Sequence, residues 1–175
     1  MNNSPETKTH YAGRFLNLVS KDGWEYATRT GSTGVVAIVA ITDQDRVLLI
    51  EQFRPPVDRF VIEIPAGLAG DIAGSESEDF AEAARRELLE ETGYQSATMK
   101  KLQTGPPSAG LTDELITFFE ATGLTKVNEG GGDESESIVV HEIPRSSLRD
   151  WLSQQAAAGK LIDPKIAAGL WMVGK

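Results

Sequence analysis

Short hydrophobic runs separated by turn residues dominate this chain and predict a sheet-rich protein. Residues 34–41 form a continuous apolar run, which favours a central strand. Residues 46–53 and 60–64 predict two more strands, each followed by proline, which cannot continue a ladder of hydrogen bonds. Similar patterns predict further strands at residues 99–103, 114–121 and 138–143.

The N-terminal part has a pattern of its own. Residues 1–10 form a polar tail, and residues 11–19 and 24–30 predict two strands around Asp22-Gly23, a dipeptide that favours a tight hairpin turn. We find no internal repeat and no second core. Because the N-terminal pattern stands apart from the rest, we divide the chain into an N-terminal tail and hairpin, residues 1–31, and a main domain, residues 32–175.

Helical periodicity is confined to three segments of the main domain. Two of them lie at residues 146–158 and 164–172. The second begins with Pro164, which is acceptable in the first turn of a helix. The third is expected to begin near Ser75, because Ser75 and Glu78 have the spacing of a capping box, and to end at Gly93. Strands mixed with a few separate helices predict an α+β fold, an α/β/α sandwich on a mixed sheet, preceded by the antiparallel hairpin.

Three glutamates stand near the end of the third helix. At about 100° per residue, Glu87 and Glu91 fall in or beside the apolar stripe, and Glu90 lies on its edge. They also lie at the negative end of the helix dipole, where they repel one another. Such a group favours a hard divalent cation, namely Mg²⁺, Mn²⁺ or Ca²⁺; the alternative is a glutamate-rich surface helix.

Composition and charge narrow the possible functions. The net charge of −9 disfavours long nucleic acid as a partner but allows a small anionic substrate that metal ions neutralise. The absence of cysteine excludes disulfide and thiol chemistry. We see neither a signal peptide nor the roughly 20 apolar residues of a membrane span, and so expect a soluble cytoplasmic protein without membrane contact.

The end of the third helix resembles the second half of the Nudix box, the Mg²⁺-binding signature of Nudix hydrolases: Arg86-Glu87-Leu88-x-Glu90-Glu91-x-Gly93. Upstream, Glu78 and Pro65-Ala66-Gly67 match earlier positions of the box. The chain departs from the box in two places. Ten residues, where the family has five, separate Gly67 from Glu78, and Tyr94 takes the last aliphatic position.

Segments 51–55, 62–67 and 107–114 resemble one branch of this family, the pyrophosphatases of ADP-ribose and other nucleoside diphosphate sugars. The resemblance implies Mg²⁺-dependent hydrolysis of the pyrophosphate bond to a nucleoside monophosphate and a sugar phosphate, and a homodimer built through residues 11–30. The marker proline of the branch falls on Ala109, which leaves the base and the sugar open, with ADP-ribose and GDP-mannose as candidates. An RNA 5′-pyrophosphohydrolase and a non-catalytic module that binds nucleotide sugars are the alternatives.

The resemblance also implies roles for single residues. It assigns a Mg²⁺ ion, or Mn²⁺ in its place, to the backbone carbonyl of Ala66 and to the side chains of Glu87, Glu90 and Glu91. Arg86 would pair with Glu90 or Glu82 and orient the site. Glu134 is expected to be the base for the attacking water, with Glu136 as a further metal ligand and Glu90 as the rival base. A solvated acidic linker is the alternative interpretation of the Glu134 segment.

Substrate contacts are expected from five further residues. Arg54 is a candidate for a phosphate or the terminal ribose, because its guanidinium group suits bidentate contacts. Glu63 can accept hydrogen bonds from ribose hydroxyls. Trp24 is expected either to stack on the base or to pack within the protein. Ser108 and Gly110 lie in the segment that resembles the substrate loop of the branch.

Overall fold

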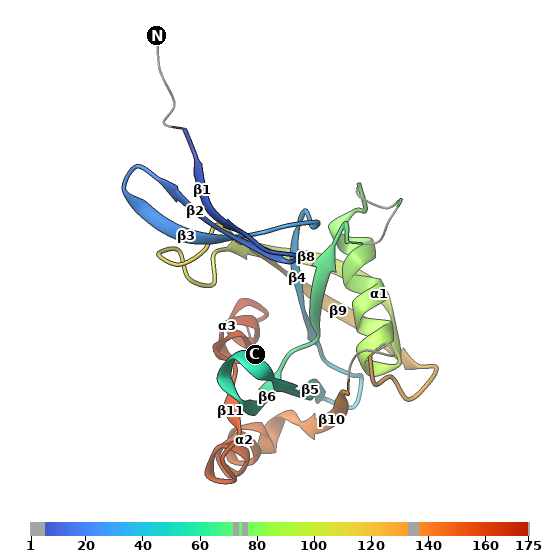
Figure 1. Cartoon of the computed structure of the whole chain (residues 1–175). Helices are drawn as coiled ribbons and strands as arrows, with labels where there is room; N and C mark the ends of the chain where they lie inside the picture. The colour runs from blue at the N-terminus through green and yellow to red at the C-terminus, as the bar shows by residue number, and fades with distance from the viewer. Residues whose placement is uncertain (1–5, 72–73, 75–76, 133–136, 175) are drawn as a thin grey trace.

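The computed structural model of this 175-residue chain describes residues 6–71, 74, 77–132 and 137–174. Its strands form three sheets (Figure 1). Helix α1 (Phe80–Thr92) covers one side of the main domain, whereas α2 (Leu148–Ala157) and α3 (Pro164–Met172) pack on the other. The mixed α+β class predicted from the sequence is confirmed.

The N-terminal sheet is antiparallel and consists of β1 (Lys8–Ala12), β2 (Leu16–Lys21) and β3 (Trp24–Arg29). The turn between β2 and β3 has positive φ at Asp22 (53°) and Gly23 (82°), as a tight hairpin requires. The predicted hairpin is therefore confirmed. The single strand predicted at residues 11–19 is wrong, because the chain turns back between β1 and β2 and forms a third strand.

The two other sheets have four strands each. The first has the order β10-β5-β6-β11, with β10 (Val139–Pro144), β5 (Arg46–Arg54), β6 (Arg59–Glu63) and β11 (Leu161–Ile162). The second has the order β7-β4-β9-β8, with β7 (Ala66–Ala69), β4 (Gly34–Ala40), β9 (Ile116–Lys126) and β8 (Tyr94–Gly105). The pairs β4–β9 and β6–β11 are parallel, and the remaining pairs are antiparallel. Single 3₁₀ turns lie at Pro55–Val57 and Arg145–Ser147.

Strand β4 is buried on both faces, which explains its continuous apolar sequence. Val36 and Ile38 point into the core beneath α1, where Leu88 packs. Ala37 and Val39 point the other way, into the core beneath the C-terminal helices. The central strand predicted from residues 34–41 is thereby confirmed, and it separates the two hydrophobic cores.

The start of α1 differs from the prediction. Asp79 caps the helix by accepting a hydrogen bond from the N–H of Ala81 at 2.8 Å, so the helix begins at Phe80 rather than near Ser75. The predicted end is confirmed: Gly93 adopts φ 75° and donates its N–H to the carbonyl of Leu89 at 2.9 Å. The predicted capping box is wrong because Asp79 offers a cap four residues later.

Two short strands escaped prediction. Strand β7 follows directly after Pro65, where the sequence pattern predicts no strand, and β11 contains only two residues. Both matter for the site, because β7 faces the glutamates of α1 and β11 positions the start of α3. Within the described part of the chain, no helix is long and apolar enough to cross a membrane.

Candidate active site

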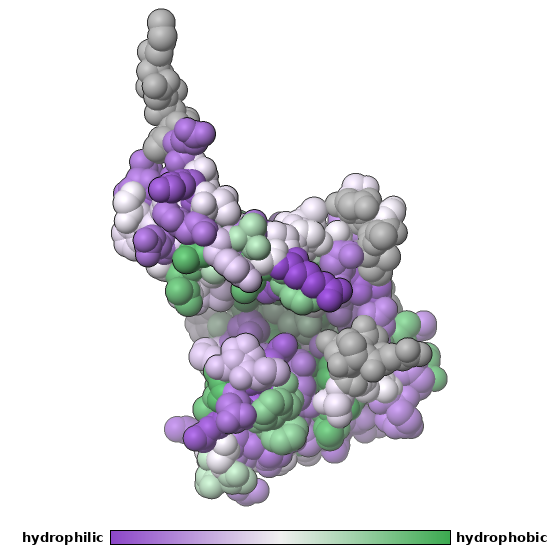
Figure 2. Space-filling model, in the orientation of Figure 1, coloured by the Kyte–Doolittle hydropathy of each residue, from purple (hydrophilic) through white to green (hydrophobic). Residues whose placement is uncertain are grey.

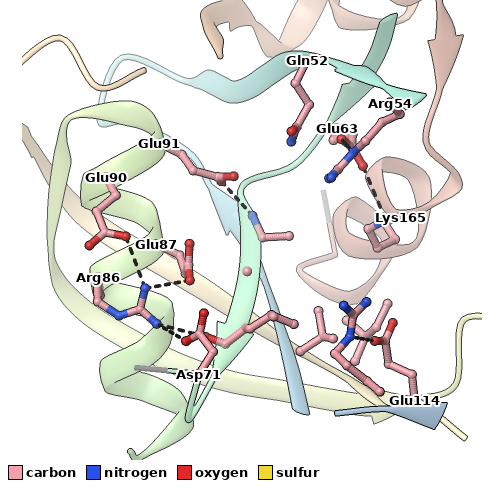
Figure 3. Close-up of a pocket in the computed structure, with 16 residues that line it drawn as sticks. Gln52, Arg54, Glu63, Asp71, Arg86, Glu87, Glu90, Glu91, Glu114 and Lys165 are labelled. Atoms are coloured by element: carbon pink, nitrogen blue, oxygen red, sulfur yellow. Dashed lines mark hydrogen bonds and ion pairs between the residues drawn. The ribbon is translucent and has the colours of Figure 1, made fainter. Parts of the chain in front are cut away.

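A pocket of about 470 Å³ lies between α1, β7, the ends of β5 and β6, and the start of α3 (Figure 3). It has two polar walls. Arg86 and the glutamates of α1 form one wall, and Arg54, Glu63 and Lys165 form the opposite one. The remaining lining residues are Arg29, Val35, Gln52, Ala66, Gly67, Leu68, Asp71, Glu114 and Ile116.

Glu91 holds α1 against β7. Its side chain is only 2% exposed, and its carboxylate accepts a hydrogen bond from the N–H of Ala66 at 2.9 Å. Leu88, which is fully buried one turn earlier, fixes the same face of the helix in the core. The predicted inward position of Glu91 is confirmed, and it places a carboxylate beside the backbone of Ala66.

Gly67 faces Glu87 across the same contact. A Cβ atom at position 67 would lie 2.0 Å from the carboxyl carbon of Glu87, so any larger residue would displace this carboxyl group from its present position. Burial raises the pKa of the Glu87 carboxyl group to about 7, although Arg86 acts in the opposite direction. The close packing of β7 on α1 therefore buries a second carboxyl group at the pocket.

Arg86 joins the acidic groups of this wall. Burial acts to lower the pKa of its guanidinium group, but the surrounding carboxylates outweigh this effect and raise it. Of the two predicted partners, Glu90 is confirmed, whereas Glu82 pairs with Arg85 at 3.6 Å. The contacts of Arg86 are Glu87 at 2.8 Å, the carbonyl of Leu68 at 2.9 Å, Glu90 at 3.2 Å, Glu78 at 3.3 Å and Asp71 at 3.4 Å.

The donor chemistry of this wall suits a divalent cation. Glu87 and Glu91 are mostly buried carboxyl groups on one helix face, and hard oxygen ligands are those that Mg²⁺ prefers. Among the described residues, no three acidic or histidine side chains converge on one point. Arg86 pairs with both Glu87 and Glu90, so a bound cation would replace its guanidinium group as their partner.

The opposite wall is built around Glu63, which is 6% exposed. Burial raises the pKa of Glu63, against the effects of Arg54 and Lys165. Arg54 donates a hydrogen bond from Nε to one carboxylate oxygen at 2.8 Å, and the ammonium group of Lys165 lies 3.9 Å from the other. Both predicted residues, Arg54 and Glu63, thus face the pocket together. Lys165 was not predicted, and neither were Asp71 and Gln52, which also line the pocket.

The other predicted substrate residues lie elsewhere. Trp24 is 65% exposed and, with Gly110, lines a separate pocket of about 430 Å³ between β3 and the loop before β9. Ser108 lines neither of these two pockets; its carbonyl accepts hydrogen bonds from the N–H groups of Leu111 and Thr112 and closes the turn of that loop. Within the single chain Trp24 does not pack in either hydrophobic core, because it is largely exposed.

Glu134 and Glu136 lie outside the described residues. The segment that precedes them is docked on the C-terminal end of α1. Gly131 and Gly132 donate their N–H groups to the carbonyls of Glu91 and Glu90 at 2.9 and 3.0 Å. Sequence reasoning missed this contact, although a run of three glycines is a recognisable signal of close backbone approach.

Comparison with known proteins agrees with the motif on α1. Residues 32–164 match the profile of the NUDIX domain. The chain belongs to the Nudix family. A crystal structure of an ADP compounds hydrolase superposes on this Nudix chain with a TM-score of 0.72 at 22% sequence identity, covering 96% of the chain and 89% of the other protein, and so shares its fold.

Relatives with several activities resemble this Nudix protein. A methanol dehydrogenase activator of Bacillus methanolicus is 35% identical over 70% of the chain, which spans 64% of that relative. The ADP-ribose pyrophosphatase of Saccharomyces cerevisiae is 38% identical over 85% of the chain and 70% of the relative. The GDP-mannose pyrophosphatase of Yersinia enterocolitica is 39% identical over 56% of the chain and 52% of the relative. The match thus spans less than two thirds of the length of the methanol dehydrogenase activator and about half of the length of the GDP-mannose pyrophosphatase.

Proposed function

We propose that this Nudix protein hydrolyses the pyrophosphate bond of nucleoside diphosphate sugars, such as ADP-ribose or GDP-mannose, to a nucleoside monophosphate and a sugar phosphate. The main support is that one pocket brings the glutamates of the Nudix box opposite a wall of hydrogen-bonding residues. Relatives named as ADP-ribose and GDP-mannose pyrophosphatases support this substrate class.

The acidic wall is the proposed site of Mg²⁺, with Mn²⁺ as a substitute. Glu87, Glu90 and Glu91, with the carbonyl of Ala66, would hold the metal. When bound, the metal supplies neutralisation of the diphosphate charge and activation of the attacking water. The hydrogen bond from the N–H of Ala66 to Glu91 fixes this carboxylate relative to β7 before any ligand arrives.

A base must accept the proton of the attacking water. We propose Glu134 for this role and Glu136 as a further metal ligand, with Glu90 as the alternative base. Glu90 is the most exposed glutamate of the wall, with 46% of its side chain accessible. Glutamine variants separate the two candidates when the Mg²⁺ requirement is measured together with kcat. Loss of the base alone should lower kcat steeply at an unchanged Mg²⁺ requirement, whereas Glu90→Gln, if Glu90 is a metal ligand only, should raise the Mg²⁺ concentration needed for activity.

The opposite wall is the proposed substrate contact. Arg54 can donate to a phosphate or ribose oxygen, and Glu63 can accept hydrogen bonds from hydroxyls. We further propose that Trp24 and Gly110, with Ser108 in the same loop, contact the base end of the substrate.

We also propose that the protein is a homodimer built through residues 11–30. Large hydrophobic side chains of this region are exposed, among them Tyr11 at 66%, Phe15 at 63% and Trp24 at 65%. On the face shown in Figure 2, hydrophobic residues gather in the hollow below the N-terminal sheet, whose outer edge is mainly hydrophilic. Sedimentation should give the mass of two chains; a single-chain mass at all concentrations would contradict this proposal.

A direct assay tests the function. The protein is incubated with Mg²⁺ and ADP-ribose or GDP-mannose, and the monophosphate and sugar phosphate are identified. Glu91→Gln should lower kcat by about 10²- to 10³-fold, or about 3–4 kcal/mol of barrier. Glu82→Gln is the matched control, because Glu82 lies on the same helix with 69% of its side chain exposed and pairs with Arg85.

Two results would contradict the proposal. The first is the absence of product from both substrates in the presence of Mg²⁺ or Mn²⁺. The second is turnover by Glu91→Gln equal to that of Glu82→Gln. Tight binding of ADP-ribose without turnover would instead indicate a nucleotide-sugar-binding module.

A further inference from the structure

Lys165 reaches the pocket through the shortest strand of the fold. Strand β11 pairs in parallel with β6, with Ile162 opposite Ile62, and the N–H of Asp163 donates to the carbonyl of Ile62 at 2.9 Å. This pairing places the first turn of α3 beside Glu63, at the end of β6. Lys165, in that turn, lines the pocket opposite the glutamates of α1 (Figure 3).

The ammonium group of Lys165 is held by two carboxylates. It forms an ion pair with Asp163 and lies 3.9 Å from Glu63, while 25% of its side chain remains exposed. An ammonium group has three hydrogen-bond donors. Asp163 accepts one of them, whereas the distance of 3.9 Å to Glu63 is that of an ion pair and not of a hydrogen bond, so two donors remain for a ligand in the pocket. The side chain is therefore positioned before a ligand binds.

The wall around Lys165 is electrically balanced. Its two cations, Arg54 and Lys165, face two carboxylates, Glu63 and Asp163. A balanced wall offers little net attraction to a phosphate, but it presents donors and acceptors side by side. Vicinal sugar hydroxyls, which both donate and accept hydrogen bonds, match this arrangement better than a phosphate does.

We propose that Lys165 binds the sugar hydroxyls of the nucleoside diphosphate sugar and sets specificity for the sugar, while the diphosphate lies toward α1. This inference rests on the proposed function, because it places the diphosphate at the glutamate wall. The inference adds Lys165, a residue of α3, to the wall of the pocket opposite the glutamates of α1, to which the Nudix box contributes no residue.

Lys165→Met tests the inference, with Lys160→Met as the matched control. Lys160 also has 25% of its side chain exposed and pairs with a buried glutamate, Glu51, at 2.8 Å, but it does not line the pocket. Thermal unfolding first establishes that both variants are folded. The KM for ADP-ribose and the inhibition constant of ADP, which lacks the terminal ribose, are then measured for wild type and both variants.

Lys165→Met should raise the KM for ADP-ribose by about 10- to 100-fold, the range of a hydrogen bond to a charged group, and change the inhibition constant of ADP less than twofold. Lys160→Met should change neither. Equal weakening of ADP-ribose and ADP would overturn the sugar assignment, because it would place Lys165 on a phosphate. An unchanged KM for ADP-ribose would overturn the role altogether.

The proposed function is checked separately by turnover of the wild-type protein. If the wild type binds ADP-ribose without hydrolysing it, the function fails, and dissociation constants measured by calorimetry replace KM in the same comparison. Weaker binding of ADP-ribose but not of ADP by Lys165→Met would then still support the assignment. Equal binding by wild type and variant would refute it.

Discussion

Arg86→Ala is the substitution that most directly tests how the acidic wall is held together. Two of its partners, Glu87 and Glu78, have only 13% and 14% of their side chains exposed, so their charges lose a partner that water replaces poorly. Asp71 and Glu90, at 35% and 46%, are solvated enough that their pairs contribute about 0–1 kcal/mol each.

The expected cost follows from these contacts. Breaking a buried ion pair by removing one partner typically costs 3–5 kcal/mol. Because this pocket is open to water, we expect the lower end, about 3 kcal/mol. The carbonyl of Leu68 also loses a hydrogen bond of 2.9 Å, but water entering the pocket can replace it.

Arg85→Ala is the control at the neighbouring position of the same helix. Arg85 pairs with Glu82 at 3.6 Å and donates to the carbonyl of Ser96 at 2.9 Å. Since the side chain of Glu82 is 69% exposed, the expected cost is about 1 kcal/mol. Both variants therefore lose an arginine, but only Arg86→Ala strips the acidic wall of its cation.

Urea unfolding in the presence of a chelator measures both costs, and a second series with Mg²⁺ tests their cause. Mg²⁺ should stabilise Arg86→Ala more than wild type, because the carboxylates no longer have to exchange an arginine for the ion. Equal destabilisation by Arg85→Ala and Arg86→Ala would refute the reasoning. The reasoning would also be refuted if Mg²⁺ raised the free energy of unfolding of Arg86→Ala no more than that of the wild type.

Two further predictions concern stability. Gly130→Ala should destabilise the protein by about 3 kcal/mol or more, because φ is +66° and the new Cβ would lie 2.4 Å from the carbonyl carbon of Thr92. Gly159→Ala is the control: with φ +89° and nothing within 4 Å, it should cost only about 1 kcal/mol. Comparable unfolding midpoints for the two variants would contradict the tight packing of the glycine segment on the end of α1. Burial acts to raise the pKa of Glu51, but hydrogen bonds from Lys160 and His141 hold it below 4.5. Its stabilising contribution is therefore present above pH 4.5 and lost as the pH falls through the lower folded-state pKa. Lys160→Met should flatten this acid dependence of the unfolding free energy between about pH 5 and 2; an unaltered slope would contradict it.

The elements that the sequence predicts well are those whose own residues determine them. Strand β4 is buried on both faces, so its apolar run needs no context, and α3 has the predicted bounds, with Pro164 in its first turn. The inward position of Glu91 followed from helical periodicity alone. The predicted start of α1 was wrong because two capping signals, Ser75 and Asp79, lie within five residues of each other, and Asp79 provides the cap that forms.

The parts of the site that the sequence could not predict depend on tertiary pairing. Lys165 faces Glu63 only because the two-residue strand β11 pairs with β6, and so short a strand leaves no periodic pattern. Gly67 leaves space for the carboxyl group of Glu87, a contact across 20 positions of sequence. Such pairs become visible only when the sheets are assembled.

The glycine segment that closes the end of α1 also bears on the order of folding. Its N–H groups come from Gly131 and Gly132, about forty residues after the glutamates whose carbonyls they meet, and the paired strands β8 and β9 lie between them in the sequence. We expect these contacts between distant segments to form after the folding transition state. Mg²⁺ should accordingly slow unfolding while leaving the refolding rate nearly unchanged, so its stabilising effect would be kinetic protection of a finished structure rather than help in forming it.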